Sequence, residues 1–335
     1  MKSTKQDIVL SYIAQFPDLP NKLLAELLFT KEEGLFMTSE SARKMIRYYK
    51  GANGNKSRKS AINAGHFEQP TISTIQEGLK KLGVISKSEA PEHVQLGEGK
   101  YLVLSDIHIP FQDDMALACA LEFGVSNGAT HIVLNGDLLD MYDVSRFLKE
   151  AKRPRISEEL EMTRNFFAYL RELFPTQAIF YKFGNHCERM RHYVLRNARE
   201  MSDIEDISLE NLLRLEHFRI IPVGREMIKL GKLVILHGHE MDSGAFSPVN
   251  PAKGMFTKAK ASAIIGHHHT TSQHSESNLH GEEISTWSTG CLCELTPEYR
   301  PYGYTKWNHG FAFVVVEKDN SFQVSNFKIV NGKIL

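Results

Sequence analysis

Five short clusters of metal-binding residue types recur along the chain. The most informative is Gly266-His267-His268-His269, because two histidines one residue apart after an apolar run can both direct ring nitrogens at a metal pair. Four others precede it: Asp106-Ile107-His108, Gly136-Asp137-Leu138-Leu139-Asp140, Gly184-Asn185-His186 and His237-Gly238-His239. Two divalent ions about 4 Å apart can clamp a phosphate and lower the pKa of a bridging water. The clusters therefore predict a two-metal centre that hydrolyses phosphate esters.

An apolar run of strand type comes directly before each cluster. These β-branched or aromatic runs are typical of buried strands and cover residues 101–104, 131–134, 178–181, 233–236 and 263–265. The aspartates of the first two clusters are 31 residues apart, about the length of a βαβ unit. Because α/β sheets usually hold their sites at the carboxyl ends of strands, we expect the five loops to converge on one cleft.

The motif order D-x-H, G-D-x-x-D, G-N-H, H and G-H-x-H resembles the calcineurin-like metallophosphoesterase superfamily, from about residue 100 to the C-terminus. The resemblance implies an α/β fold, a four-layer α/β/β/α sandwich in which two mixed sheets pack face to face between helices. The alternation of residues 311–316 and 322–329 supports a closing β-hairpin, with its turn near Asp319-Asn320.

The resemblance also implies a role for each motif residue. The first metal would be held by Asp106, His108 and His269, Asp137 would bridge, and the second metal would be held by Asn185, His237 and His267. A metal-bridging hydroxide would attack phosphorus, with His186 beside the leaving-group oxygen and Asp140 orienting His186. Oxygen and imidazole donors without thiolates suit divalent Mn, Fe, Zn or Ni, and Mn is our first choice.

The sequence departs from the family pattern in two places. One concerns an acidic residue beside the third motif, and the other concerns the class of substrate. Cys187 follows G-N-H where the family usually has Asp or Glu, and Glu188, the next residue, is able to take over the contacts of that acid. Met141 and Phe183 stand where the Ser/Thr protein phosphatase branch carries arginines. The second departure argues against a phosphoprotein phosphatase.

The composition is that of an ordinary globular protein. The chain has 335 residues, 42% of them hydrophobic, and 40 basic residues balance 40 acidic ones, so overall charge indicates no nucleic-acid partner. A polar start without a long apolar segment predicts no signal peptide or membrane span, hence a cytoplasmic protein with reduced thiols. Cys291-x-Cys293 lacks a second pair at structural-zinc spacing, so we expect these thiols to pack in the core.

The first hundred residues differ in kind from the rest. Apolar periodicity predicts short helices over 7–16, 21–29, 39–49 and 71–82, separated by Pro and Gly. We interpret residues 1–88 as a small all-α module of helix-turn-helix type, residues 89–99 as a linker and residues 100–335 as the catalytic domain.

The third helix and its tail are strongly basic. No Asp or Glu occurs between Ser41 and His66, whereas that segment contains Arg43, Lys44, Arg47, Lys50, Lys56, Arg58 and Lys59. Such a helix could lie along nucleic-acid phosphates, and the alternative is a solvated face with a flexible basic loop. Positive residues that follow two of the clusters could also hold a polyanion, and the alternative is a solvated surface. They are Arg146, Lys149, Lys152, Arg153 and Arg155 after the second cluster, and Arg189 and Arg191 after the third.

Segments near the C-terminus and in the basic helix resemble phage and prophage members of the superfamily, among them Gly290–Cys293 and Trp307–Phe311. The leading hypothesis is a phosphodiesterase or nuclease, most simply acting on DNA, that works in a host cytoplasm. One alternative is a nucleotide or cyclic-nucleotide phosphoesterase whose N-terminal helices mediate self-association. Another is a DNA-binding regulator with an inert phosphoesterase scaffold. The oligomeric state stays open.

Overall fold

The computed structural model describes residues 4–50, 71–86, 93–146, 154–241, 249–297 and 304–335. The chain divides into two compact units, Met1–Glu89 and Ala90–Leu335. We describe each unit by itself.

The first unit contains helices close to the predicted ones. These are α1 (Lys5–Gln15), α2 (Asn21–Lys31), α3 (Ser39–Tyr49) and α5 (Ile72–Lys81). The side chains of Thr4 and Thr38 cap α1 and α3 by accepting from backbone N–H groups. Helices α1 to α3 bury a common core that includes Ile13, Leu28 and Ile46, whereas α5 buries none of its residues.

The second unit is built on two sheets. The seven-stranded sheet has the order β13 (Lys333–Ile334), β12 (Phe322–Val330), β11 (His309–Val316), β2 (Gly99–Leu104), β3 (His131–Asn135), β4 (Ala178–Lys182), β5 (Ile220–Gly224). The six-stranded sheet has the order β1 (His93–Leu96), β6 (Met227–Leu230), β7 (Leu233–Ile235), β8 (Ala263–Ile265), β10 (Glu283–Ser288), β9 (Ser272–Ser277). Strands β2 to β5 run parallel, as do β7 and β8, so their carboxyl ends gather at common edges.

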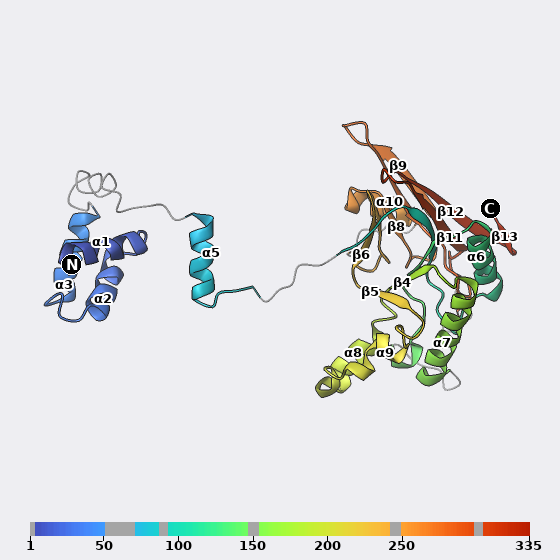
Figure 1. The fold of residues 1–335 in the computed structure, drawn as a ribbon, viewed down its shortest axis with the longest axis horizontal. Helices are drawn as coiled ribbons and strands as arrows, with labels where there is room; N and C mark the ends of the chain where they lie inside the picture. The colour runs from blue at the N-terminus through green and yellow to red at the C-terminus, as the bar shows by residue number, and fades with distance from the viewer. Residues whose placement is uncertain (1–3, 51–70, 87–92, 147–153, 242–248, 298–303) are drawn as a thin grey trace. The chain divides into compact units, whose positions relative to one another are not determined.

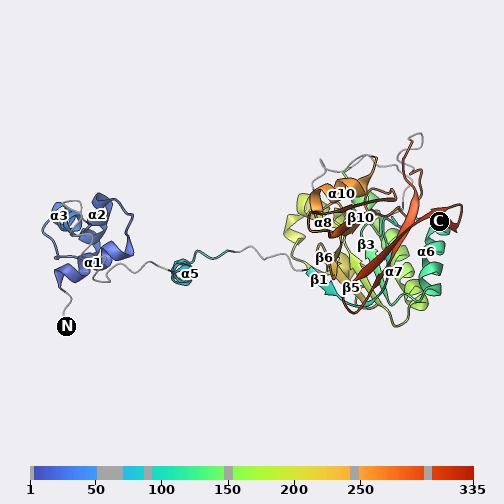
Figure 2. The same cartoon turned by 90° about the horizontal axis from the view of Figure 1, so that it is seen from above.

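Alternating side chains divide the core into layers, because successive strand residues face opposite sides of a sheet. Leu102 and Leu104 pack with α6 (Asp114–Ser126) and α7 (Ile156–Leu173), while Tyr101 and Val103 face the second sheet. On the far side of that sheet, Ile265 packs with Met255 of α10 (Pro251–Ala259). Figures 1 and 2 show α10 on one side of the strands and α6 and α7 on the other. The predicted α/β/β/α sandwich is confirmed.

Smaller elements complete this unit. They are α8 (Arg189–Asn197), α9 (Leu209–Leu212) and the 3₁₀ turns Tyr142–Val144, Arg199–Met201 and Glu205–Ile207. The predicted C-terminal hairpin is present as β11 and β12, with Asn320 in the left-handed region at φ 64°. None of the described helices is long and apolar enough to cross a lipid bilayer.

One predicted boundary is wrong. Residues 93–96, which we expected in a linker over 89–99, form strand β1 and pair with β6. Their side chains reach the core between the sheets, where Val94 and Leu96 are partly buried. A four-residue edge strand flanked by Pro91 and Gly97 gives too short an apolar pattern to be distinguished from a linker.

Candidate metal centre

The predicted ligands lie on loops that leave the carboxyl ends of β2, β3, β4, β7 and β8, as the strand pattern indicates. Their backbones share an uncommon conformation. The left-handed region holds Asp106 (φ 55°), His108 (φ 53°), Asp137 (φ 46°), His267 (φ 65°) and His269 (φ 53°). Residues with a Cβ rarely adopt this region, and such strain clusters at functional sites. The loops therefore hold these side chains at a conformational cost that surrounding contacts offset.

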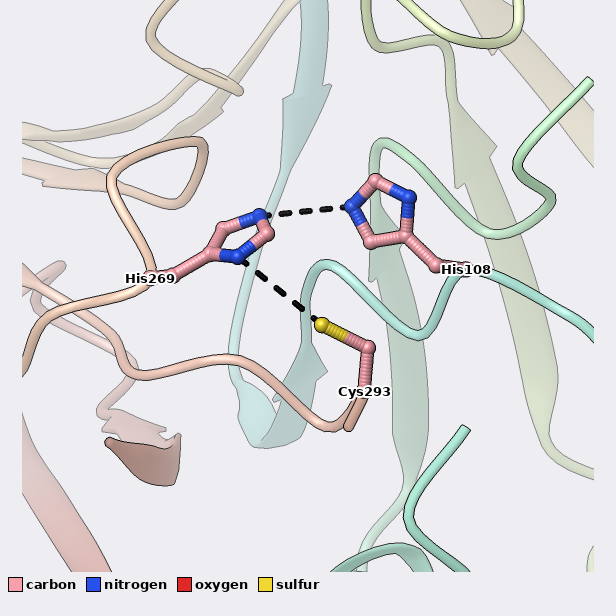
Figure 3. Close-up of side chains that lie close together, drawn as sticks. All are labelled: His108, His269 and Cys293. Carbon is pink, nitrogen blue, oxygen red and sulfur yellow. Dashed lines mark hydrogen bonds between the residues drawn. The ribbon is translucent and has the colours of Figure 1, made fainter. Parts of the chain in front are cut away.

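The residues expected to hold the first metal face one another. Nε2 of His108 lies 3.3 Å from Nε2 of His269, as Figure 3 shows. Oδ1 of Asp106 lies 3.2 Å from the same His269 atom and 4.0 Å from Nε2 of His108. Two nitrogen ligands about 2.1 Å from a tetrahedral ion are about 3.4 Å apart. The spacing of the two rings matches that separation.

The residues expected around the second metal are also close together. Ligand atoms of Asp137, His237 and His267 lie within 4.8 Å of one another, and so do those of Asp137, His108 and His186. Oδ2 of Asp137 is 3.1 Å from Nε2 of His237 and 4.0 Å from Nε2 of His186. Asp137 thus belongs to both groups, which is the position that a bridging carboxylate requires.

Three buried donor atoms give a direct test of whether these residues fit metal ions. Asp106 Oδ1, Asn185 Oδ1 and His237 Nε2 have no hydrogen-bond partner in the described part of the chain. An unsatisfied buried polar atom is costly and calls for an explanation such as an ion. Other buried atoms of the described residues also lack such a partner, but these three belong to predicted ligands and a bound cation would satisfy them, so the donor set fits divalent metal ions.

The electrostatics of the centre favour cations as well. Burial would raise the pKa of Asp106, but His269 and His237 hold it below its usual range. Burial would likewise lower the pKa of His237, yet the carboxylates of Asp137 and Asp106 raise it to about 9. In the same way the pKa of His269 is raised to about 10, chiefly by Asp106. The carboxylates therefore attract positive charge, either protons or metal ions.

Each of three predicted histidine ligands has a partner at Nδ1, the ring nitrogen that faces away from the ligand cluster. Nδ1 of His108 lies 3.0 Å from Oδ1 of Asp140. Nδ1 of His237 donates to the Asn135 carbonyl at 2.8 Å. Nδ1 of His269 lies 3.8 Å from Sγ of Cys293, on the side opposite His108 in Figure 3. Such partners fix the tautomer and orientation of metal-binding imidazoles.

Asp140 and Arg189 surround the predicted catalytic histidine. Oδ1 of Asp140 lies 3.0 Å from Nδ1 of His186, and the same oxygen contacts His108. Arg189 donates from Nη2 to Nε2 of His186 at 2.9 Å and from Nη1 to the Asp140 carbonyl at 2.8 Å. A guanidinium only donates, so Nε2 of His186 accepts and its proton lies on Nδ1, toward Asp140. Arg189 therefore belongs to the centre itself.

Comparison with known proteins agrees with this geometry. The sequence profile of the family described as calcineurin-like phosphoesterase matches residues 99–299, more than half of the chain. The chain belongs to this family. It is a metal-dependent phosphoester hydrolase, as the motif resemblance indicated.

Its curated relatives include proteins of two mycobacteriophages. The phosphoesterase is 26% identical to the Gene 54 protein of Mycobacterium phage D29 over 245 residues, covering 70% of this chain and 95% of that protein. It is 25% identical to the Gene 54 protein of Mycobacterium phage L5 over 229 residues, covering 65% and 89%.

Solved structures with a similar chain path include Vps29 from Chaetomium thermophilum, at 14% identity and a TM-score of 0.37, covering 71% of this chain and 95% of that one. A dimetal phosphatase from Danio rerio matches at 9% identity and a TM-score of 0.33, covering 71% and 96%.

The residue that departs from the family pattern, Cys187, lies in the core of the phosphoesterase. Its thiol is buried beside the Tyr181 hydroxyl at 3.1 Å, and burial raises its pKa to about 11. Glu188 forms an ion pair with Arg225 and lies 3.8 Å from His192. Neither contact involves a predicted ligand, so neither residue takes the place of the missing acid in the described part of the site.

An ion pair between a buried lysine and a partly exposed glutamate, which the sequence did not reveal, supports the second ligand group. Lys182, fully buried at the end of β4, lies with Nζ 2.7 Å from Oε1 of Glu240. The Glu240 carboxylate accepts from the backbone N–H groups of His237 at 3.2 Å and Gly238 at 2.6 Å. The pair thereby fixes the turn that carries His237.

The basic residues expected to contact nucleic acid fall into different environments. Lys44 and Arg47 are exposed on α3, and Arg43 pairs with Glu40 at 3.2 Å. Nζ of Lys50 instead donates to the carbonyls of Pro17 at 2.7 Å and Leu19 at 2.8 Å, so it closes the connection between α1 and α2. The remaining predicted positions, Lys56, Arg58 and Lys59, lie outside the described residues.

Proposed function

We propose that the phosphoesterase is a two-metal phosphodiesterase that hydrolyses nucleic acid, with DNA as the first substrate to test and manganese as the first metal. The observation that carries the metal-dependent chemistry is the grouping of Asp137 with His237 and His267 and with His108 and His186, in each case with ligand atoms within 4.8 Å of one another. The proposal of a polyanionic substrate is supported by Arg189, whose guanidinium lies beside the predicted catalytic histidine.

Seven residues would hold the ions: Asp106, His108, Asp137, Asn185, His237, His267 and His269. Two divalent ions, when bound, would lower the pKa of a water molecule and neutralise charge on the phosphate. His186 would hold a proton at Nε2 and pass it to the leaving-group oxygen, while Oδ1 of Asp140 accepts from Nδ1–H and stabilises the imidazolium. For that transfer Arg189 must leave Nε2 of His186, and its guanidinium would then bind a phosphate oxygen.

We assign the N-terminal unit a role in nucleic-acid contact, which rests on the exposed Lys44 and Arg47 of α3. The logarithm of the binding constant falls linearly with the logarithm of the salt concentration. Each phosphate contact that is lost should reduce the magnitude of this slope by about one. Full-length Lys44→Ala and Arg47→Ala variants should bind duplex DNA more weakly than a Lys22→Ala control on α2. Equal affinities and slopes in all three variants would show that α3 does not contact DNA. Self-association would then be the remaining role for this unit.

The main test is manganese-dependent cleavage of single- and double-stranded DNA beside bis-p-nitrophenyl phosphate, with wild type and His186→Ala. DNA cleavage that disappears in the variant is the expected result. Turnover of the small diester alone would indicate a nucleotide-sized substrate. Failure to hydrolyse either would favour a DNA-binding regulator with an inert scaffold. An enzyme of the phage type with a nucleic-acid substrate would act in the host cytoplasm.

A further inference from the structure

A cavity of about 340 Å³ adjoins the candidate metal centre at Asn185. Its other lining residues include Ser145, Arg146, Arg189, His192 and Arg196, and none of the described residues that line it is Asp or Glu. Because Asn185 is a predicted metal ligand and Arg189 contacts His186, the cavity is continuous with the catalytic residues. A ligand in this cavity would therefore lie next to the reacting phosphate.

Helix α8 supplies the positive face of the cavity. His192 and Arg196 follow Arg189 by three and seven residues, and this spacing places all three on one side of a helix. Arg146 approaches from the loop after the 3₁₀ turn Tyr142–Val144. Two separate segments thus direct basic side chains at one space.

Among the described residues, two nearby acids offset only part of this charge. Asp140 lies 3.5 Å from Nη1 of Arg189, and Glu188 is shared between Arg225 and His192. Arg196 forms no ion pair with any carboxylate of the described residues. The cavity therefore keeps an excess of positive charge, which favours an anionic ligand.

A buried hydroxyl group in the cavity wall lacks a partner. Ser145 is only 7% exposed, and its Oγ has no hydrogen-bond partner among the described residues. A buried hydroxyl without a partner is costly, and a ligand oxygen in the cavity would satisfy it. This observation is independent of the arginines and points to a ligand with oxygen acceptors.

We propose that this cavity, which we call the α8 pocket, binds a second phosphate group of the substrate, next to the one hydrolysed at the metal centre. The inference rests on the proposed function and narrows its substrate to esters with at least two phosphates, such as oligonucleotides. A nucleoside monophosphate or a simple diester supplies only the phosphate at the metals, so it would leave the charge of Arg196 uncompensated.

The test compares the binding of two small nucleotides to the manganese-loaded full-length protein by titration calorimetry. Thymidine 3′,5′-bisphosphate carries one phosphate more than thymidine 5′-monophosphate, and it is too small to reach beyond the pocket. We expect the bisphosphate to bind about tenfold tighter, the lower range for hydrogen bonds to charged groups. Arg196→Ala should abolish this preference and Arg196→Lys should keep part of it. Lys318→Ala, which removes an exposed charge in the β11–β12 turn, should preserve it fully.

Equal affinity of the wild type for the two nucleotides would overturn the inference, and so would a preference that survives in Arg196→Ala. Turnover of bis-p-nitrophenyl phosphate, measured on the same preparations, tests the proposed function separately. A bisphosphate preference without turnover would retain the α8 pocket and reject the proposed phosphodiesterase activity. Turnover without the preference would retain the hydrolase and reject the pocket.

Discussion

Arg189 donates a hydrogen bond of 2.9 Å to Nε2 of His186. This ring nitrogen is the one that must face the leaving group. The other terminal nitrogen of Arg189 donates to the carbonyl of Asp140 at 2.8 Å. The guanidinium thus holds His186 as a neutral acceptor in this state. Proton transfer requires the guanidinium to exchange this contact for one with substrate.

Replacement of this arginine should therefore lower catalysis more than stability. We expect Arg189→Met to reduce kcat/KM for bis-p-nitrophenyl phosphate by about 10² to 10³, the effect of losing a donor to developing charge. Arg189→Lys should recover only part, because an ammonium cannot bind two oxygens in the fork geometry. Arg199→Met, an exposed charge in a separate turn, is the control. Wild-type kcat/KM in Arg189→Met would exclude a contact with substrate.

Asp140 contacts both His108 and His186 through Oδ1, so its loss should affect two processes. Asp140→Asn should lower kcat by about 10² to 10⁴ through His186. It should also weaken metal binding by about 10- to 100-fold, because His108 loses its orienting partner. His186→Ala should lower kcat alone. Manganese titrations followed by electron paramagnetic resonance distinguish the variants, and equal metal affinities would show that Asp140 does not orient His108.

Cys293 has the corresponding position behind His269, with Sγ 3.8 Å from Nδ1. Cys293→Ala should weaken manganese binding by about tenfold, the lower end of the loss in metal affinity expected when a residue that orients a histidine ligand is removed. Cys293→Ser should retain most of the affinity. Cys119→Ala provides the matched control for a thiol remote from the centre. Calorimetric titration of the metal gives these affinities directly. Identical values for the Ala and Ser variants would mean that the thiol only fills space.

The Lys182–Glu240 pair predicts a pH dependence of stability. Glu240 is mostly buried, which would raise its pKa, but Lys182 lowers it from 4.5 to about 2. Since the folded pKa is depressed, the stabilisation is present above about pH 4.5 and is lost as the pH falls toward 2. Glu240→Gln should lower the free energy of unfolding by about 3 kcal/mol at pH 7, because Lys182 keeps an uncompensated buried charge. Urea denaturation of the metal-free protein measures this free energy of unfolding. The difference in unfolding free energy between the variant and wild type should become smaller at low pH.

The sequence predicted the strands before the ligand loops well because the relevant patterns are local, whereas the layers were implied by the family resemblance. An apolar run followed by a metal-binding cluster occurs within ten residues, as in Leu102 to Asp106, and it specifies both a strand and a loop at its end. The same holds for the helices of the first unit. Several other strands were not predicted, among them β1, which is short, and β9 (Ser272–Ser277), which is polar and largely exposed.

The contacts that position the ligands depend on tertiary structure and left no such local pattern. The thiol behind His269 comes from Cys293, and the lysine that anchors the His237 turn comes from β4. In sequence, Cys291-x-Cys293 indicated only packing and Lys182 an ordinary strand end. Side-chain direction across a sheet interface decides these partners, and periodicity specifies the face of a strand but not the neighbour opposite it.

The candidate centre draws its ligands from both sheets, Asp106 and Asp137 from one and His237 and His269 from the other. A nascent chain consequently cannot assemble it until residue 269 and the strands that flank it have left the ribosome. Assembly of the full ligand set is thereby restricted to chains that extend past His269. A product of interrupted synthesis that ends before this residue would carry the first ligands without the last ones and would be inactive.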